Sequence, residues 1–125
     1  MFPHESHRPL YTFLEAMQRK DLDTMLAQMA ETVILKTPLD VEAFPGKPAV
    51  RPVAQALLRV VDKFDFREIM QGPRHVAVFF KVSVGALELD AMDYFRLGET
   101  GLIEEMTVLW RPLPSVVAVH ELLSH

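Results

Sequence analysis

The clearest pattern along the chain is an alternation of apolar and polar residues between positions 74 and 111. Within Arg74–Val84 every second residue is apolar, which predicts a long strand with one deeply buried face. Two more strands are expected within Leu87–Pro112, joined by a turn at Gly98–Gly101 where glycine accepts positive φ. We therefore expect three consecutive antiparallel strands that share one apolar face.

Helical spacing dominates the first half of the chain. A first helix is expected to end near Lys20, with apolar residues at i, i+3, i+4 and i+7: Leu10, Phe13, Leu14 and Met17. Asp21 is expected to cap a second, short helix, because its carboxylate can accept a hydrogen bond from a backbone N–H of the first turn. The apolar face of that helix is Leu22, Met25, Leu26 and Met29. A third helix should open at Pro48 or Pro52 and a last one at Pro114, since proline fits a first helical turn.

These elements predict a single α+β domain. Short strands are expected at Thr32–Lys36 and Phe66–Gln71, with a loop at Leu39–Lys47 before the third helix. Helices followed by an antiparallel meander favour a curved antiparallel sheet wrapped around the helices, a cone-shaped arrangement. We expect the domain to span residues 9–125 after a polar tail at residues 1–8. Side chains fill such a cone poorly, so an internal cavity is expected.

Composition narrows the classes of function. The chain has 125 residues, 50% of them hydrophobic, which suits one buried core and not a disordered chain. Its formal net charge of −4 comes from interspersed acids and bases, so nothing predicts nucleic-acid binding. The absence of cysteine excludes disulfides and thiolate chemistry, and no metal or other cofactor is indicated. No apolar run approaches the ~20 residues of a membrane span, and the polar N-terminus favours a cytoplasmic protein.

One carboxylate, Asp93, interrupts the apolar face of the meander. Strand alternation places it with Leu89, Ala91 and Phe95 instead of with the polar residues. Burying an unpaired carboxylate costs several kcal/mol unless the group becomes neutral or finds a partner. Asp93 is therefore the polar focus of a pocket, a buried carboxyl hydrogen-bonded to a backbone amide, or a residue on a slightly rotated strand, and these interpretations stay open.

Short motifs along the chain resemble the nuclear transport factor 2-like superfamily, in particular its SnoaL-like and ketosteroid isomerase-like branches. They are Lys20–Asp23, Phe44–Pro48, Met92–Arg96, and Gly101–Glu105 leading into Arg111–Pro112. The resemblance covers residues 8–123 and implies the cone-shaped α+β fold. Because one fold carries many chemistries in this superfamily, function has to be transferred residue by residue.

The ketosteroid isomerase site is incomplete in this chain. The resemblance puts Thr37 where those enzymes carry a carboxylate base, and a threonine does not abstract a carbon-bound proton near neutral pH. Phe13 stands in the place of their tyrosine donor. Only the second donor, a buried protonated aspartic acid, has a counterpart, which is Asp93. The sequence therefore argues against steroid isomerisation.

Two further branches match no better. In the epoxide-hydrolase branch Ala91 stands in the place of the arginine, and Thr107 or Val108 in the place of the second aspartate. The polyketide-cyclase branch uses an aspartate and a histidine. Here His75 falls on the outer face of the sheet and His120 close to the terminus, so no histidine is expected in the pocket.

The function favoured by these observations is the binding of a small hydrophobic molecule, apolar or aromatic, in an internal pocket. The expected lining residues are Phe13, Met17, Met29, Thr37, Phe44, Leu57, Phe80, Ala91, Met106, Val108 and Trp110. If the protein is an enzyme, Asp93 is expected to donate a proton or hydrogen bond to a carbonyl in an isomerase, lyase or cyclase type of reaction. Ligand, water or a rim residue such as Glu104 would then supply the base. The alternative is a non-catalytic ligand-binding or dimerisation module of the same fold.

The outer face of the meander is too apolar for a solvated sheet. It carries His75, Ala77, Phe79, Met92, Tyr94, Thr107 and Leu109. Relatives of this fold commonly pair through that surface, so the resemblance implies a homodimer with twofold symmetry.

Overall fold

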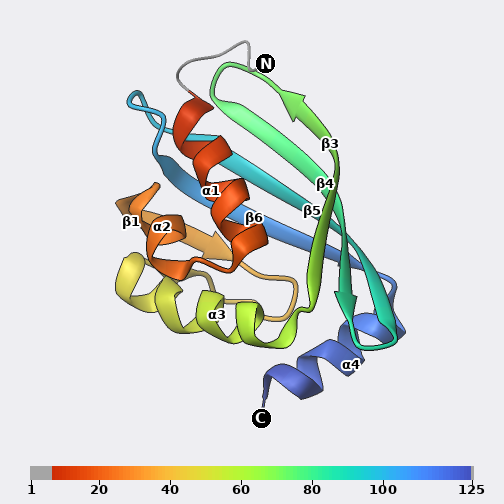
Figure 1. Cartoon of the computed structure of the whole chain (residues 1–125). Helices are drawn as coiled ribbons and strands as arrows, with labels where there is room; N and C mark the ends of the chain where they lie inside the picture. Colours follow the sequence, from red (N-terminus) through yellow and green to blue (C-terminus); the bar gives the residue numbers. More distant parts are fainter. Residues whose placement is uncertain (1–6, 125) are drawn as a thin grey trace.

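A computed structural model describes residues 7–124, and within them the chain forms four helices and six strands. In chain order these are α1 (Arg8–Arg19), α2 (Leu22–Ala27), β1 (Met29–Lys36), β2 (Phe44–Pro45), α3 (Lys47–Val60), β3 (Lys63–Gln71), β4 (His75–Val84), β5 (Leu87–Leu97), β6 (Ile103–Arg111) and α4 (Leu113–Leu123). Figure 1 shows one curved, open sheet with α1, α2 and α3 on its concave face and α4 at one end. This is the α+β architecture expected from the sequence.

The strands are arranged in the order β2-β1-β6-β5-β4-β3. From β3 to β6 they form the predicted antiparallel meander. β1 lies parallel to β6, so the sheet is mixed and not wholly antiparallel as expected. The reason is topological: α3 carries the chain from β1 to the opposite edge, and successive hairpins return β6 to the side of β1 in the same direction. The loop expected at Leu39–Lys47 also contains β2, which pairs Phe44 with Leu35 on β1.

The alternation predicted for the meander is confirmed. Its buried residues on β4 and β5 are Val76, Val78, Phe80, Val82, Val84, Leu89, Ala91, Asp93, Phe95 and Leu97. The register shifts at three places, between Met29 and Ile34, between Phe66 and Glu68, and between Arg96 and Leu97. An extra residue in one strand of a pair bends that strand and increases its twist. These irregularities therefore favour the curvature that makes the sheet concave.

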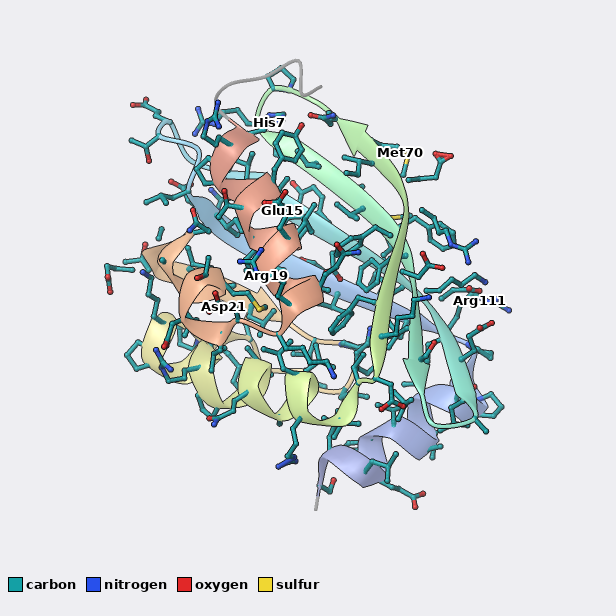
Figure 2. The ribbon with its side chains drawn as sticks, in the orientation of Figure 1. His7, Glu15, Arg19, Asp21, Met70 and Arg111 are labelled. Atoms are coloured by element: carbon teal, nitrogen blue, oxygen red, sulfur yellow. The ribbon has the colours of Figure 1, made fainter. Side chains whose placement is uncertain are left out.

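The folded part begins earlier than the expected boundary at residue 9. Arg8 opens α1, with Pro9 in its first turn. His7 is fully buried, and its ring nitrogens lie 2.9 Å from Gln71 Oε1 and 3.0 Å from the carbonyl oxygen of Pro73. Figure 2 shows His7 at the start of α1, beside the end of β3. Residues 1–6 of the expected tail lie outside the described residues.

The second and third helices begin as their sequences predict, but the second ends earlier than expected. Asp21 caps α2, since its Oδ1 accepts a hydrogen bond from the Thr24 N–H at 3.2 Å. α2 ends at Ala27, so Met29 belongs to β1. α3 runs on through Pro52 and buries Val50, Ala54 and Leu58 most deeply. Val61 and Phe64, which are also buried, lie beyond its end.

The helices of this domain are all short. None within residues 7–124 is long and apolar enough to cross a membrane.

Candidate functional site

A cavity of about 260 Å³ lies between the concave face of the sheet and the helices. The expected residues that line it are Phe13, Met17, Met29, Thr37, Phe44, Leu57, Phe80, Met106, Val108 and Trp110, together with Asp93. They come from α1, β1 and the residue after it, β2, α3, and strands β4, β5 and β6, because the curvature of the sheet brings these elements around one space.

Ala91 is the one expected wall residue that the structure places outside the cavity lining. It is buried on β5 between Phe80 on β4 and Trp110 on β6, its partners in the sheet. Both partners reach the cavity, whereas the single methyl group of Ala91 lies in the core beneath them. Strand alternation correctly predicted that Ala91 faces the interior, but its side chain is too short to reach the cavity.

Asp93 sits at the centre of the sheet, paired with Val78 on one side and Val108 on the other. Only 1% of it is exposed, and within residues 7–124 neither carboxyl oxygen has a hydrogen-bond partner. A carboxyl tied to a backbone amide, the second interpretation left open by the sequence, is therefore excluded for this part of the chain. Burial in apolar surroundings raises the pKa of Asp93 well above its ordinary value. The protonated form, which is favoured, is a hydrogen-bond donor.

The arginine nearest to Asp93 in sequence is occupied elsewhere. Arg96 Nη1 donates to Glu104 Oε1 at 2.6 Å, and its Nε lies 3.4 Å from Glu105 Oε1. Glu104 does not line the cavity, so the expectation of a rim base at this residue is wrong. The cause is the register shift after Arg96, which leaves Glu104 without a partner in the ladder and beside Arg96.

The cavity wall combines rigid aromatic rings with flexible thioethers. Phe13 packs edge-on against Phe95 at 5.7 Å between ring centroids, and Phe80 packs in the same way against Phe66 at 5.3 Å. Four methionines share the wall: Met17, Met25, Met29 and Met106. Methionine adapts its shape to a ligand at small energetic cost, so this wall suits apolar molecules of varied outline.

Thr37 stands at the mouth of the cavity and fixes a turn. Its hydroxyl donates to Asp40 Oδ2 at 2.8 Å and accepts from the N–H groups of Leu39 and Asp40, both at 3.2 Å. This use of the hydroxyl is consistent with the sequence argument that Thr37 is no base. The same hydrogen bond holds the carboxylate of Asp40 beside the cavity, which Asp40 also lines.

A histidine does reach the cavity, against expectation. His120, Leu123 and Ser124 on α4 and just beyond its end line the mouth. Their spacing from buried Val116, at i+4, i+7 and i+8, places them on one helix face. That spacing was a usable signal in the sequence, but where α4 packs is decided by tertiary contacts.

The charged groups of the site do not assemble a metal centre. Among residues 7–124 no group of three or more His, Asp or Glu side chains could hold a metal ion.

Comparisons with known proteins agree with this architecture. The family model of the SnoaL-like domain matches residues 10–106. An uncharacterised protein with a cystatin-like fold from Silicibacter pomeroyi is 27% identical, with a TM-score of 0.89 over 94% of this chain and 84% of its own. A steroid delta-isomerase from Pseudomonas aeruginosa is 23% identical, with a TM-score of 0.90 over 99% of this chain and 93% of its own. No curated protein matches the chain.

A more distant neighbour extends the comparison. The epoxide hydrolase/cyclase-like enzyme SalBIII, which has a role in pyran ring formation in salinomycin, is 18% identical. Its TM-score is 0.76 over 87% of this chain and 92% of its own. At these identities the likeness to the isomerase and to SalBIII concerns the fold alone.

Proposed function

The chain belongs to the SnoaL-like domain family, and on that premise we propose that it binds a small hydrophobic molecule carrying a hydrogen-bond acceptor. Membership confirms the resemblance that the sequence motifs carried, and the family suggests ligand binding or isomerase- and cyclase-type activity. The observation that carries the proposal for this chain is the unpartnered carboxyl of Asp93, buried among apolar cavity walls.

A hydrogen-bond acceptor on the ligand would satisfy Asp93. Buried polar groups in native proteins are nearly always hydrogen-bonded, and an exception calls for a functional explanation. A neutral carboxyl has one O–H to donate, and a ligand carbonyl accepts it. The apolar remainder of the ligand would lie against the phenylalanine and methionine side chains of the wall. Binding would thus remove both an unmet hydrogen bond and exposed apolar surface.

The same contact would serve catalysis. A donor fixed in a site that excludes water stabilises negative charge that develops on a carbonyl oxygen. We propose an isomerase, lyase or cyclase type of reaction for a catalytic form of this site, with Asp93 polarising the substrate carbonyl. Two structural neighbours, a steroid delta-isomerase and an epoxide hydrolase/cyclase-like enzyme, lend support. Thr37 and Phe13 do not supply the isomerase's other groups, and a non-catalytic binding module is the alternative.

A pair of matched ligands tests the proposal. Tetralone is a two-ring ketone, and tetralin is the same skeleton without the carbonyl. We expect wild-type protein to bind both, because the wall is apolar, and to prefer tetralone by roughly 2- to 10-fold through one net hydrogen bond. Quenching of the fluorescence of Trp110, the single tryptophan, reports binding, and a raised Tm confirms it.

Two variants assign the preference to Asp93. Asp93→Asn keeps a donor and should keep the preference for the ketone, whereas Asp93→Leu has none and should bind tetralone and tetralin equally. Absence of binding across a panel of such molecules contradicts the proposal. Retention of the ketone preference in Asp93→Leu contradicts the role of Asp93.

We further propose that the outer face of the sheet pairs with a second copy of the chain. Across β4, β5 and β6 the register aligns Phe79, Met92 and Leu109 in one apolar row. Leu109 is 58% exposed, which is unusual for a leucine in mid-strand. A row of ion pairs borders this patch: Lys81 Nζ lies 2.5 Å and Arg111 Nη1 2.6 Å from Asp90. Figure 2 places Arg111 on the side of the sheet away from α1–α3. An apolar patch with a charged border suits a symmetric interface.

A further inference from the structure

The polar side chains that line the cavity fall into two separate groups. Asp93 stands alone at the centre of the sheet. The second group lies at the mouth, on the β1–β2 loop and on α4: Thr37, Asp40, His120 and Ser124. Every other side chain in the lining is apolar except for the indole N–H of Trp110. A ligand that fills the cavity would therefore meet polar groups at its two ends and apolar groups between them.

Register gives the separation between Asp93 and Thr37, the residue of the second group that directly follows a strand. The last pair between β1 and β6 joins Lys36 to Thr107, so Thr37 continues the strand beside Val108. Val108 is in turn the partner of Asp93. Two steps between neighbouring strands amount to about 10 Å. A body of one or two rings with a hydrogen bond at each end covers that span.

Asp40 offers an acceptor at the mouth. Its Oδ2 accepts the hydroxyl of Thr37 at 2.8 Å, which restrains the carboxylate next to the cavity. Within residues 7–124 no side chain or backbone group donates to its Oδ1. A carboxylate accepts hydrogen bonds through both oxygens, so Oδ1 is free for a donor on a ligand.

His120 lines the same cavity from α4, on the helix face that carries buried Val116 and half-buried Leu123. Its side chain, like that of Asp40, is exposed, which places both at the solvent side of the cavity. The neutral imidazole has one nitrogen that accepts a hydrogen bond, and its ring makes no side-chain hydrogen bond to any residue in the range 7–124. Asp40 and His120 thus present two acceptors to whatever occupies the mouth.

We infer that Asp40 and His120 form a second anchor, which selects compact ligands that carry a hydroxyl at the end remote from their hydrogen-bond acceptor. This ligand class rests on the proposed function, because it takes the Asp93 contact as its first anchor. The cavity, at about 260 Å³, is smaller than the range of roughly 300–1,000 Å³ usual for drug-sized ligands. The class is therefore a one- or two-ring hydroxyketone, with its carbonyl at Asp93 and its hydroxyl between Asp40 and His120.

Calorimetric titration with three related molecules tests the inference. These are tetralin, tetralone, and a hydroxytetralone whose hydroxyl lies on the ring remote from the carbonyl. Wild-type protein should bind the hydroxytetralone roughly 3- to 10-fold more tightly than tetralone, through the added hydrogen bond to a charged or polar acceptor. The double variant Asp40→Ala with His120→Leu should lose this gain and keep its affinity for tetralone.

Matched controls lie on the same two elements. Glu42 is exposed on the β1–β2 loop and Glu121 is exposed on α4, and neither lines the cavity. The double variant Glu42→Ala with Glu121→Ala should retain the gain from the hydroxyl. It removes comparable surface polarity without touching the mouth.

The outcomes separate the two proposals. If tetralone binds but the hydroxyl adds nothing in wild-type protein, the second anchor is refuted while the contact at Asp93 stands. The same holds if the gain persists in Asp40→Ala with His120→Leu. If neither tetralone nor tetralin binds, the proposed function fails and the ligand class fails with it.

Discussion

Two aspartates on β5 show what environment does to one side chain. Asp90 points to the outer face, where hydrogen bonds from Lys81 and Arg111 lower its pKa. Asp93, three residues further, points to the inner face, where burial without a partner raises its pKa. The two pKa values shift in opposite directions because alternation along the strand places the two side chains on opposite faces of the sheet. Burial thus favours the neutral, hydrogen-bond-donating form of the inward carboxyl, and the two cations favour the ionised form of the outward one.

The variant Asp93→Asn should gain stability over wild-type protein as pH rises from about 4 to 8. A raised folded pKa means that the contribution of Asp93 to stability is fully present below its unfolded pKa of about 3.9 and falls until the folded pKa is passed. The variant should gain about 1.4 kcal/mol for each pH unit between the two values. Urea unfolding at a series of pH values measures the difference.

Asp90→Asn is the control with the opposite sign. Because the folded pKa of Asp90 is lowered, its contribution is present above the unfolded pKa and lost as pH falls. The free energy of unfolding of this variant should therefore fall relative to that of wild-type protein as pH rises through about 4. If Asp93→Asn behaves like Asp90→Asn, Asp93 is a paired carboxylate and its role as a neutral donor is wrong.

Single residues were predictable wherever a regular strand or helix fixed the direction of the side chain. Parity identified Asp93, Phe80 and Trp110 from the sequence alone. His120 and Asp40 were missed because their positions depend on where α4 and the β1–β2 loop pack, which local pattern does not encode. The mouth of the cavity thus depends on tertiary packing, whereas the residues of its floor follow from the alternation within β4, β5 and β6.

At the scale of elements, the regular pieces followed the sequence and the irregular ones did not. The two residues of β2 are too few to show an alternation. The register shift between Arg96 and Leu97 has no signature in the hydrophobic pattern, yet it moves Glu104 away from the cavity rim. Irregular elements decide the curvature of the sheet and the position of side chains next to them.

Gly46, the residue that precedes α3, has a backbone conformation that makes it sensitive to substitution. Its φ of +84° and ψ of 156° belong to a region that only glycine adopts readily. A Cβ there would meet no atom closer than 3.6 Å, so the strain lies in the backbone and not in a clash. Gly46→Asn should destabilise the protein by about 1–3 kcal/mol in denaturant unfolding.

Gly85 provides the comparison for that substitution. It sits in the β4–β5 turn with φ of +58°, near the left-handed region that asparagine also occupies, and nothing lies within 4 Å of an added Cβ. Gly85→Asn should change stability by less than about 1 kcal/mol. Equal effects of the two substitutions would show that the entry to α3 is not strained by a side chain.

At the scale of the whole molecule, the order of elements was enough to predict the fold. Helices followed by a meander implied a curved sheet around helices, and the SnoaL-like domain match agrees. The parallel pairing of β1 with β6 was not predictable, because it depends on which edge of the sheet the chain reaches after α3. The direction of a strand relative to a distant neighbour is set by the whole path of the chain.

The proposed dimer should dissociate when its apolar patch is charged. Tyr94→Lys combined with Leu109→Lys places two cations on the patch, and a twofold interface, which buries the same patch of both copies, would bring four of them together. Light scattering should report a dimer for wild-type protein at micromolar concentration and a monomer for the double variant. Val41→Lys, at a fully exposed apolar residue of the β1–β2 loop, should remain a dimer. A monomeric wild-type protein would exclude this interface.

The central claim is that Asp93 holds its proton inside the cavity and offers it to a ligand. The most direct measurement is a titration of the Asp93 carboxyl carbon by ¹³C NMR, assigned from its loss in Asp93→Asn. Asp93 should keep the chemical shift of a protonated carboxyl well above the pH at which an ordinary aspartate ionises, about 3.9. On the same spectra Asp90 should ionise below its ordinary range. An Asp93 carboxyl that ionises at or below about pH 4 would contradict the claim, because an anion cannot donate a hydrogen bond.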